Sequence, residues 1–224
     1  MTEQKNETTS SKAEKFVSKN AKILIVCVVV IACAVAGYIL GNSISSKSSA
    51  KALAEIDNIS YELTKDSAAL ETTELDARRA TAFEKLVPYA QKGGVVGVRA
   101  NMLCADLAYQ QEKYEDSAKY WEAVAAKSKK SYTAPIANYN LGVCYEQLGK
   151  LDDAIAAYKK AADAADFTLR AHASYSYGRA LEAKGDYKAA VEAYTALNDR
   201  TPEDTWAKLA KTRILTLQVE GKAE

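Results

Sequence analysis

The fold is decided by residues 140–161, which read NLGVCYEQLGKLDDAIAAYKKA. Apolar and small side chains recur there every three or four residues, as on the buried face of a helix, and Gly149 interrupts them once. A glycine can adopt the positive φ that ends a helix tightly. The stretch therefore predicts two helices joined by a short turn at Gly149.

The same pattern returns on both sides of this stretch. Three segments align, namely KYEDSAKYW at 113–121, KLDDAIAAY at 150–158 and DYKAAVEAY at 186–194. Each has an aromatic residue or Leu, a small residue three positions later and an aromatic residue four positions after that. The steps between them are 37 and 36 residues. Periods of this length predict stacked helix pairs, so the expected fold class is an all-α solenoid.

The middle copy resembles the tetratricopeptide repeat, because Leu141-Gly142-x-x-Tyr145 precedes Gly149 at the spacing of that family. The third copy keeps Gly178 and Gly185, whereas the first has Ala105 and Glu112 at the two glycine positions. The resemblance implies that small residues let helices approach closely while aromatic residues fill the gap to the next unit. We expect repeats at 98–131, 135–168 and 171–204.

Helices are also expected on both sides of the repeats. The segment 42–97 is predicted to hold a tether followed by a helical pair at 48–67 and 74–91. Gly93-Gly94 predicts a turn before the first repeat. Within 205–224, the stretch Thr205 to Val219 reads as an amphipathic helix that covers the last repeat. Terminal units of a solenoid need such a cap because their outer face is otherwise apolar.

Residues 23–41 read ILIVCVVVIACAVAGYILG, which is nineteen residues without a charge. At about 1.5 Å per residue, a helix of this length matches the hydrocarbon thickness of a bilayer. Five lysines precede the stretch within 1–22, and only Lys47 and Lys51 follow it closely. This bias predicts one transmembrane helix, a cytoplasmic segment at 1–22 and an exported carboxyl-terminal domain.

Alternatives to a retained span remain. Ala34-Val35-Ala36 resembles a signal-peptidase site, and Val30-Ile31-Ala32-Cys33 resembles a relaxed lipidation motif. We favour retention because the segment before the apolar run is long and the run continues past both cut sites. Cys33, Gly37 and Gly41 form a stripe of small residues, which indicates packing against a partner helix unless glycines simply collect near the end of a span.

The composition argues against several classes of function. A net charge of +1 gives no reason to expect nucleic acid. There is no C-x-x-C pair, and His172 is the only histidine, so no metal site, catalytic triad, cofactor site or small-molecule substrate is expected. We expect Cys104 and Cys144 to be reduced and buried, although a disulfide between them is an alternative in an oxidising compartment.

The inner face of the first helix of each unit predicts a protein-binding groove. Tyr and Arg are enriched at binding hot spots, and both occur at the expected groove positions. An alternative is that Tyr139 and Tyr175 only pack between neighbouring helices. The Lys and Asn clamp with which relatives hold acidic tails is missing. The predicted groove residues are Arg99, Met102, Asp106, Tyr109, Tyr139, Val143, Glu146, His172, Tyr175 and Arg179.

The whole layout is similar to the YfgM-like family of ancillary Sec-translocon subunits, most specifically where Glu14-Lys15-Phe16-Val17-x-x-Asn20-Ala21-Lys22 leads into the apolar run. The resemblance implies a non-enzymatic, single-pass protein of the cytoplasmic (inner) membrane with a periplasmic domain. Its implied role is to link the translocon to periplasmic chaperones. The alternative is an envelope scaffold in cell division or outer-membrane assembly, with no translocon role.

Overall fold

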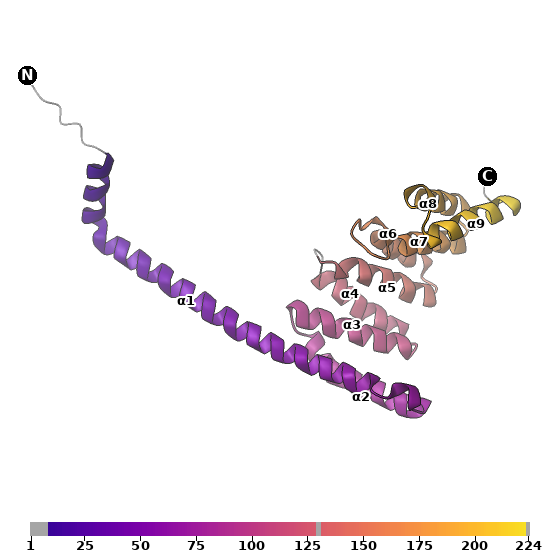
Figure 1. The fold of residues 1–224 in the computed structure, drawn as a ribbon, viewed down its shortest axis with the longest axis horizontal. Helices are drawn as coiled ribbons and strands as arrows, with labels where there is room; N and C mark the ends of the chain where they lie inside the picture. Colours follow the sequence, from indigo (N-terminus) through magenta and orange to yellow (C-terminus); the bar gives the residue numbers. More distant parts are fainter. Residues whose placement is uncertain (1–8, 129–130, 223–224) are drawn as a thin grey trace, which may run out of the picture. The chain divides into compact units, whose positions relative to one another are not determined.

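The computed structural model describes residues 9–128 and 131–222, apart from the side chains of 9–15, 21–29, 32, 36 and 39–44. Over these residues every regular element is helical, which confirms the all-α class. The chain divides into two compact units, 1–51 and 52–224. The elements are α1 (Thr9–Thr64), the 3₁₀ turn η1 (Ser67–Ala69), α2 (Thr72–Ala90), α3 (Gly94–Gln110), α4 (Tyr114–Lys127), α5 (Thr133–Gln147), α6 (Leu151–Asp163), α7 (Arg170–Lys184), α8 (Tyr187–Arg200) and α9 (Thr205–Val219) (Figure 1).

The first unit contains the amino-terminal part of α1. Its described apolar side chains lie in solvent; Val30, Ile31 and Tyr38 are 61%, 61% and 75% exposed. Much of the predicted span at 23–41 falls on side chains outside the described part of the chain. Among the residues that are described, no helix is both long enough and apolar enough to cross a membrane.

The sequence predicts a tether before a helix at 48–67, whereas the structure has helix throughout Thr9–Thr64. The Ser-rich residues 42–51 contain no proline and do not interrupt a helix. The helix also ends earlier than predicted. Asp66 adopts a positive φ of 55°, and the Thr64 hydroxyl donates to the Ser60 carbonyl (3.0 Å).

In the second unit, the last turns of α1 and the helices α2 to α9 form a stack. Each helix from α2 onward contacts the next in the sequence, and α9 also contacts α7 (Figure 1). Short turns between consecutive helices favour antiparallel pairs. The helices of the three predicted units are α3 with α4, α5 with α6, and α7 with α8.

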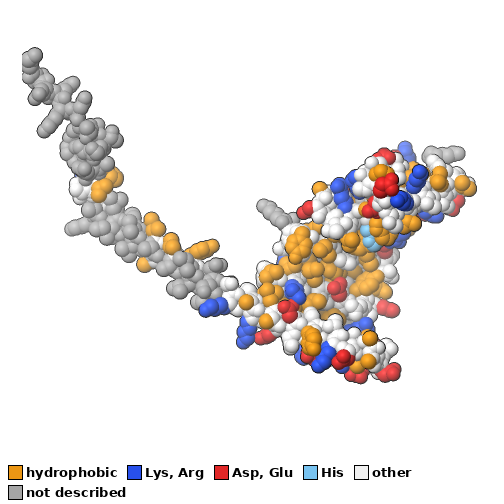
Figure 2. Space-filling model, viewed as in Figure 1, with side chains coloured by type: hydrophobic (Ala, Val, Ile, Leu, Met, Phe, Trp, Pro, Cys, Tyr) orange, Lys and Arg blue, Asp and Glu red, His pale blue; other side chains and the backbone are white. Residues whose placement is uncertain are grey.

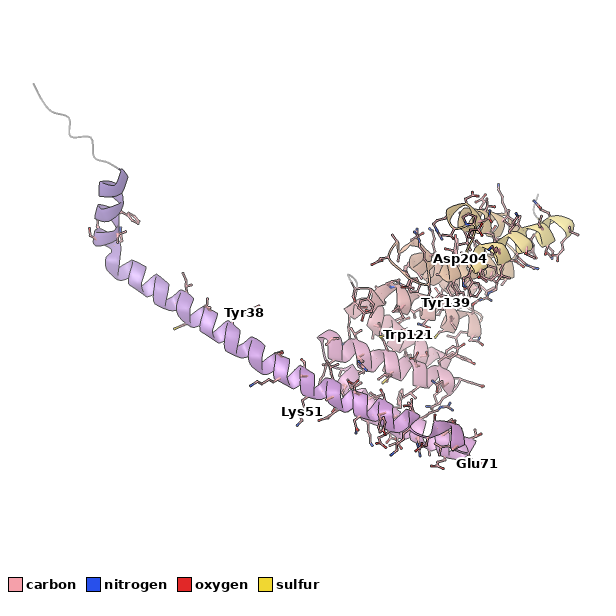
Figure 3. All side chains as sticks on the ribbon, viewed as in Figure 1. Tyr38, Lys51, Glu71, Trp121, Tyr139 and Asp204 are labelled. Atoms are coloured by element: carbon pink, nitrogen blue, oxygen red, sulfur yellow. The ribbon has the colours of Figure 1, made fainter. Side chains whose placement is uncertain are left out.

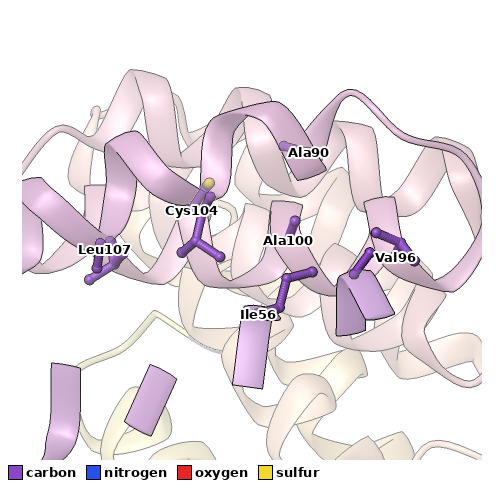
Figure 4. Close-up of a cluster of buried hydrophobic side chains, with 9 residues drawn as sticks. Ile56, Ala90, Val96, Ala100, Cys104 and Leu107 are labelled. Carbon is purple, nitrogen blue, oxygen red and sulfur yellow. The ribbon is translucent and has the colours of Figure 1, made fainter. Parts of the chain in front are cut away.

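The core is divided among neighbouring pairs of helices. In the first cluster, Ile56 of α1 lies with Ala90 of α2 and with Val96, Ala100 and Leu107 of α3 (Figure 4). Ile56 is completely inaccessible to solvent, and burying a side chain of this size contributes about 1.5–3 kcal/mol. The other clusters continue the core through the remaining helices as far as α9.

In the second and third units, the small residue lies against the aromatic residue sixteen positions later. A Cβ added at Gly142 would meet the Tyr158 ring at 2.5 Å, and Gly178 lies equally close to Tyr194. Tyr158 and Tyr194 are fully buried. These glycines therefore permit a close approach of the two helices that no larger side chain allows.

Cys104 and Cys144, the two cysteines of the repeats, are free and buried, as predicted. Cys104 contributes to the cluster beneath α2, and Cys144 lies in the next cluster. The Cys144 thiol donates to the Ser117 hydroxyl (3.2 Å), and burial raises the pKa of Cys104 to about 12. Such thiols are protonated and unreactive at neutral pH.

Candidate functional site

Three adjoining hollows run along the face of the stack formed by α3, α5 and α7. The first has a volume of about 590 Å³ and lies between α3 and the end of α4. Its apolar wall includes Val95, Val98 and Met102 of α3, and Tyr132 closes it from the following loop. Asp106 lies at its far end.

The second hollow is smaller, about 140 Å³, and shares Asp106 with the first. It lies between the first two units, where Tyr109 of α3, Trp121 of α4 and Val143 of α5 line it. Asn140 and Gln110 supply its polar atoms besides Asp106.

The third hollow has a volume of about 640 Å³ and shares Val143 with the second. Tyr139 and Glu146 of α5 line one wall, and Tyr175 and Arg179 of α7 line the other. Because each hollow shares a residue with the next, we treat the three as one feature and call it the inner groove. Figure 3 shows Trp121, Tyr139 and Asp204 at successive levels of the stack, and Figure 2 shows hydrophobic side chains gathered on this part of the unit, beside the one histidine.

All ten residues predicted for the groove line one or more of these hollows. Arg99, Met102 and Asp106 lie in the first, and Tyr109 lies in the second. The remaining six, with Val143 shared between two hollows, are Tyr139, Val143, Glu146, His172, Tyr175 and Arg179. The structure thus brings the ten together, and their role in binding remains a prediction.

Tyr139 and Tyr175 also pack between helices, as the alternative interpretation expects. The Tyr139 ring lies 5.6 Å from that of Tyr158, and the Tyr175 ring lies 5.5 Å from that of Tyr194. Both residues are only partly buried. Each therefore contributes one face to the stack and another to the groove.

Trp206 of α9 forms the end wall of the third hollow. Its ring stacks on His172, with centroids 3.8 Å apart and an angle of 9° between the planes. The Tyr139 hydroxyl lies 3.0 Å from Nε2 of the same histidine. Burial, followed by the charge of Arg179, lowers the pKa of His172, so this ring is neutral at pH 7.

A carboxylate, a phenol and a guanidinium meet between the second and third units. Glu146 of α5 accepts from the Tyr158 hydroxyl (2.5 Å) and from Nη2 of Arg179 (2.6 Å). Burial, together with the bond to this carboxylate, raises the pKa of Tyr158 far above its ordinary value. Charge-assisted bonds of this kind hold neighbouring helices in register.

The same arrangement recurs one unit later. Glu182 of α7 accepts from Nε of Arg213 in α9 (2.8 Å) and from the Tyr194 hydroxyl (3.2 Å). The bond from Arg213 lowers the pKa of Glu182. Glu146 and Glu182 occupy equivalent positions, four residues after Gly142 and Gly178.

The first junction is different. Tyr109, four residues after Ala105, stands where the later units have Glu146 and Glu182. Trp121 stands where they have the buried tyrosines, and Val143 of α5 lines the same hollow as both. Asp106 lies beside this junction and forms no ion pair or hydrogen bond with any other described residue. Burial raises the pKa of its carboxyl to about 6.

Sequence reasoning missed several groove residues. Val95 and Val98 lie on the same face of α3 as Met102, at helical spacing, so extending the register by two turns would have found them. Trp206 belongs to the capping helix and Tyr132 to a loop. Their contribution depends on how α9 and the loop lie on the stack, which no repeat pattern specifies.

The proposed membrane-packing stripe lies on α1. Cys33 and Gly37 are exposed, and the side of α1 at Gly41 lies outside the described residues. Elsewhere in the described part of the chain, no three His, Cys, Asp or Glu side chains gather in a way that could hold a metal ion.

Comparison with known proteins identifies the repeats. A family model described as "Tetratricopeptide repeat" matches residues 104–168 and 164–205. The chain is also 29% identical over 130 residues to a "TPR repeat-containing protein" of Treponema pallidum (strain Nichols), which covers 58% of this chain. The match covers 54% of that protein, so the chain spans about half the length of the curated relative it matches.

Neither match refers to a Sec-translocon subunit or to a membrane span, and neither indicates a catalytic family. Tetratricopeptide repeats are solenoids whose curved surfaces bind other proteins. The chain therefore contains tetratricopeptide repeats, as the sequence pattern predicts, and these repeats indicate a protein–protein interaction module.

Proposed function

We propose that the chain is a membrane-anchored, extracytoplasmic module that binds a segment of another protein in its inner groove. The observation that carries this proposal is the succession of three adjoining hollows along one face of the stack. Three hollows with shared walls extend over α3, α5 and α7, and both apolar and charged side chains line them. An extended or helical segment of a partner fits such a surface, with apolar anchors in the larger hollows.

Anchoring is supported by the uncharged residues 23–41 and by the lysines before them. The described apolar side chains near this stretch, such as Val30, Ile31 and Val35, are at least half exposed. Apolar surface of this kind is stable in lipid and costly in water. We place the repeats on the exported side of a cytoplasmic membrane.

For the biological role, we propose an accessory of the Sec translocon that connects the channel to periplasmic chaperones. The support is the layout of a lysine-rich segment, an apolar stretch and repeats, which resembles the YfgM-like family. The second candidate is a scaffold of the cell envelope. Purification of the full chain in mild detergent separates the two, because channel subunits support the first and division or outer-membrane assembly proteins support the second.

Photocrosslinking tests the groove directly. A photoreactive phenylalanine derivative replaces Met102 in the full chain, expressed in its own cells. Met102 is partly buried in the first hollow and makes none of the polar contacts that hold the stack together. We expect a discrete adduct with another protein after irradiation.

The matched control places the same derivative at Glu192, which is exposed on α8 and lines none of the three hollows. An adduct at position 102 and none at position 192 supports binding in the groove. If adducts form at position 192 while position 102 stays unmodified, another face of the stack binds the partner and the proposal is wrong.

A further inference from the structure

The junction between the first two units differs from the other two in a consistent way. At the later junctions a carboxylate pairs with an arginine two helices further on. Glu146 of α5 pairs with Arg179 of α7, and Glu182 of α7 pairs with Arg213 of α9. At the first junction the arginine position holds Val143, and the carboxylate position holds Tyr109. A hollow of about 140 Å³ lies there.

The charges along the groove leave one group unpaired. Arg99 pairs with Asp57 of α1 (2.5 Å), Arg179 pairs with Glu146 (2.6 Å), and the Lys127 ammonium donates to a backbone carbonyl of Lys92 (2.9 Å). Asp106 is exposed at the wall between the first and second hollows and has no such partner among the described residues.

The surroundings of Asp106 suit a cation. Aromatic side chains of Tyr109 and Trp121 line the adjoining hollow, and the amide of Asn140 lies on its other side. An aliphatic stem can lie against such rings while its charged end reaches a carboxylate. Solvent reaches Asp106, but the walls of two hollows partly desolvate its carboxyl and raise its pKa to about 6. A cation beside it would therefore relieve a cost that the free protein bears.

We propose that the bound segment inserts a basic side chain, arginine or lysine, between the first two units, where it pairs with Asp106 and lies against Tyr109. The partner thereby supplies at the first junction the cation that Arg179 and Arg213 supply at the other two. The inference rests on the proposed function, because it assumes that a protein segment occupies the inner groove. An apolar side chain next to the basic one would enter the larger hollow lined by Val98 and Met102.

The test uses the full chain purified in detergent and a displayed library of random twelve-residue peptides. Selected peptides are synthesised, and their Kd values are measured by fluorescence anisotropy. We expect the selected peptides to carry an arginine or lysine beside an apolar residue. Replacing that arginine by neutral citrulline, or that lysine by norleucine, weakens binding about tenfold, as expected for a hydrogen bond to a charged group.

A double-mutant cycle distinguishes direct pairing from a structural effect. Asp106→Asn weakens binding of the basic peptide about tenfold, but it does not weaken binding of the neutral peptide further. Asp106→Glu, which keeps the charge, retains most of the affinity. Glu192→Gln is the matched control, an exposed acid on α8, and leaves the Kd unchanged. Circular dichroism verifies that each variant is folded.

The two proposals fail differently. If selected peptides crosslink to position 102 and bind equally well with citrulline or with Asp106→Asn, the groove binds peptides and the inference about a basic side chain is wrong. If Asp106→Asn weakens both peptides equally, the carboxylate acts on the structure and the inference also fails. If no selected peptide crosslinks to the groove, the proposed function itself is contradicted.

Discussion

Asp106 is a residue whose chemistry is set by its position in the stack. Solvent reaches its side chain, yet the walls of two hollows surround the carboxyl and raise its pKa to about 6. Arg99 and Lys127 line the same hollow, but each is held by another partner. Tyr109 and Cys144, the other titratable groups nearby, stay protonated through this range, because burial raises the pKa of each.

This raised pKa predicts how stability depends on pH. An unfolded aspartate has a pKa of about 3.9, so between about pH 4 and pH 6 the native state holds more protons at this site than the unfolded state. The contribution of Asp106 to stability therefore falls as the pH rises through this window, and the full penalty is present above it. We expect Asp106→Asn to stabilise the protein more at about pH 7.5 than at about pH 4.5, measured by urea unfolding of both proteins. An equal effect at both values would show that the carboxyl is not desolvated.

At the same scale, the sequence predicted ten groove positions because a single register of small residues fixes which face of α3, α5 and α7 points inward. It did not predict that Asp106 lacks a partner. That property depends on Arg99 pairing with Asp57, which lies in another helix and outside the repeats. A pair between residues this far apart in the chain produces no periodic pattern in the sequence.

The ends of the first helices of the three units are closed in the same way. In each unit, a residue with positive φ follows the helix, and the next backbone N–H donates to the carbonyl five positions before it, as from Lys150 to Tyr145 (2.8 Å). The residues concerned are Gly149 (φ 69°), Gly185 (φ 88°) and Glu112 (φ 59°). Glu112 thus adopts the left-handed conformation, which is unfavourable for a residue that has a Cβ.

Glu112→Gly is expected to increase the free energy of unfolding by about 1 kcal/mol, because glycine removes the steric cost of the left-handed conformation. Gly149→Ala, its matched opposite in the second unit, is expected to lower the free energy of unfolding by a similar amount. Urea denaturation of both variants measures the two changes. A loss of stability in Glu112→Gly would mean that the glutamate side chain stabilises the turn by more than its backbone costs.

The steps of 37 and 36 residues predict helix pairs because a solenoid repeats its contacts along the chain. The segment before the repeats has no such repeat. Residues 42–47 were predicted as a tether, and the structure has helix there. Serine, which fills three of these six positions, occurs both in loops and within helices, so composition alone does not separate the two.

The full chain joins a proposed membrane anchor to a stack of helices. Membrane fractions and protease access test this layout. We expect the full chain to stay in the pellet after alkaline extraction and residues 52–224 to be digested only when the outer membrane is permeabilised. The mass of the purified protein shows whether the segment before Gly37 (the signal-peptidase site) or before Cys33 (the lipidation motif) has been removed.

A variant without residues 23–41 is the control and should appear in the supernatant. Release of the unaltered full chain by alkaline extraction would contradict a spanning helix. Digestion of the repeats only after lysis of the cytoplasmic membrane would contradict the proposed orientation.

The two matching junctions have a consequence for how such a protein can grow. A duplicated third unit would find an acceptable neighbour on each side, because its own Arg179 would meet the Glu182 of the original copy and its Glu182 would meet Arg213. Tandem duplication could thus lengthen the protein at its carboxyl-terminal end without inventing a new contact. A duplicated first unit would not reproduce this contact, because Tyr109 and Val143 stand at the carboxylate and arginine positions of its junction.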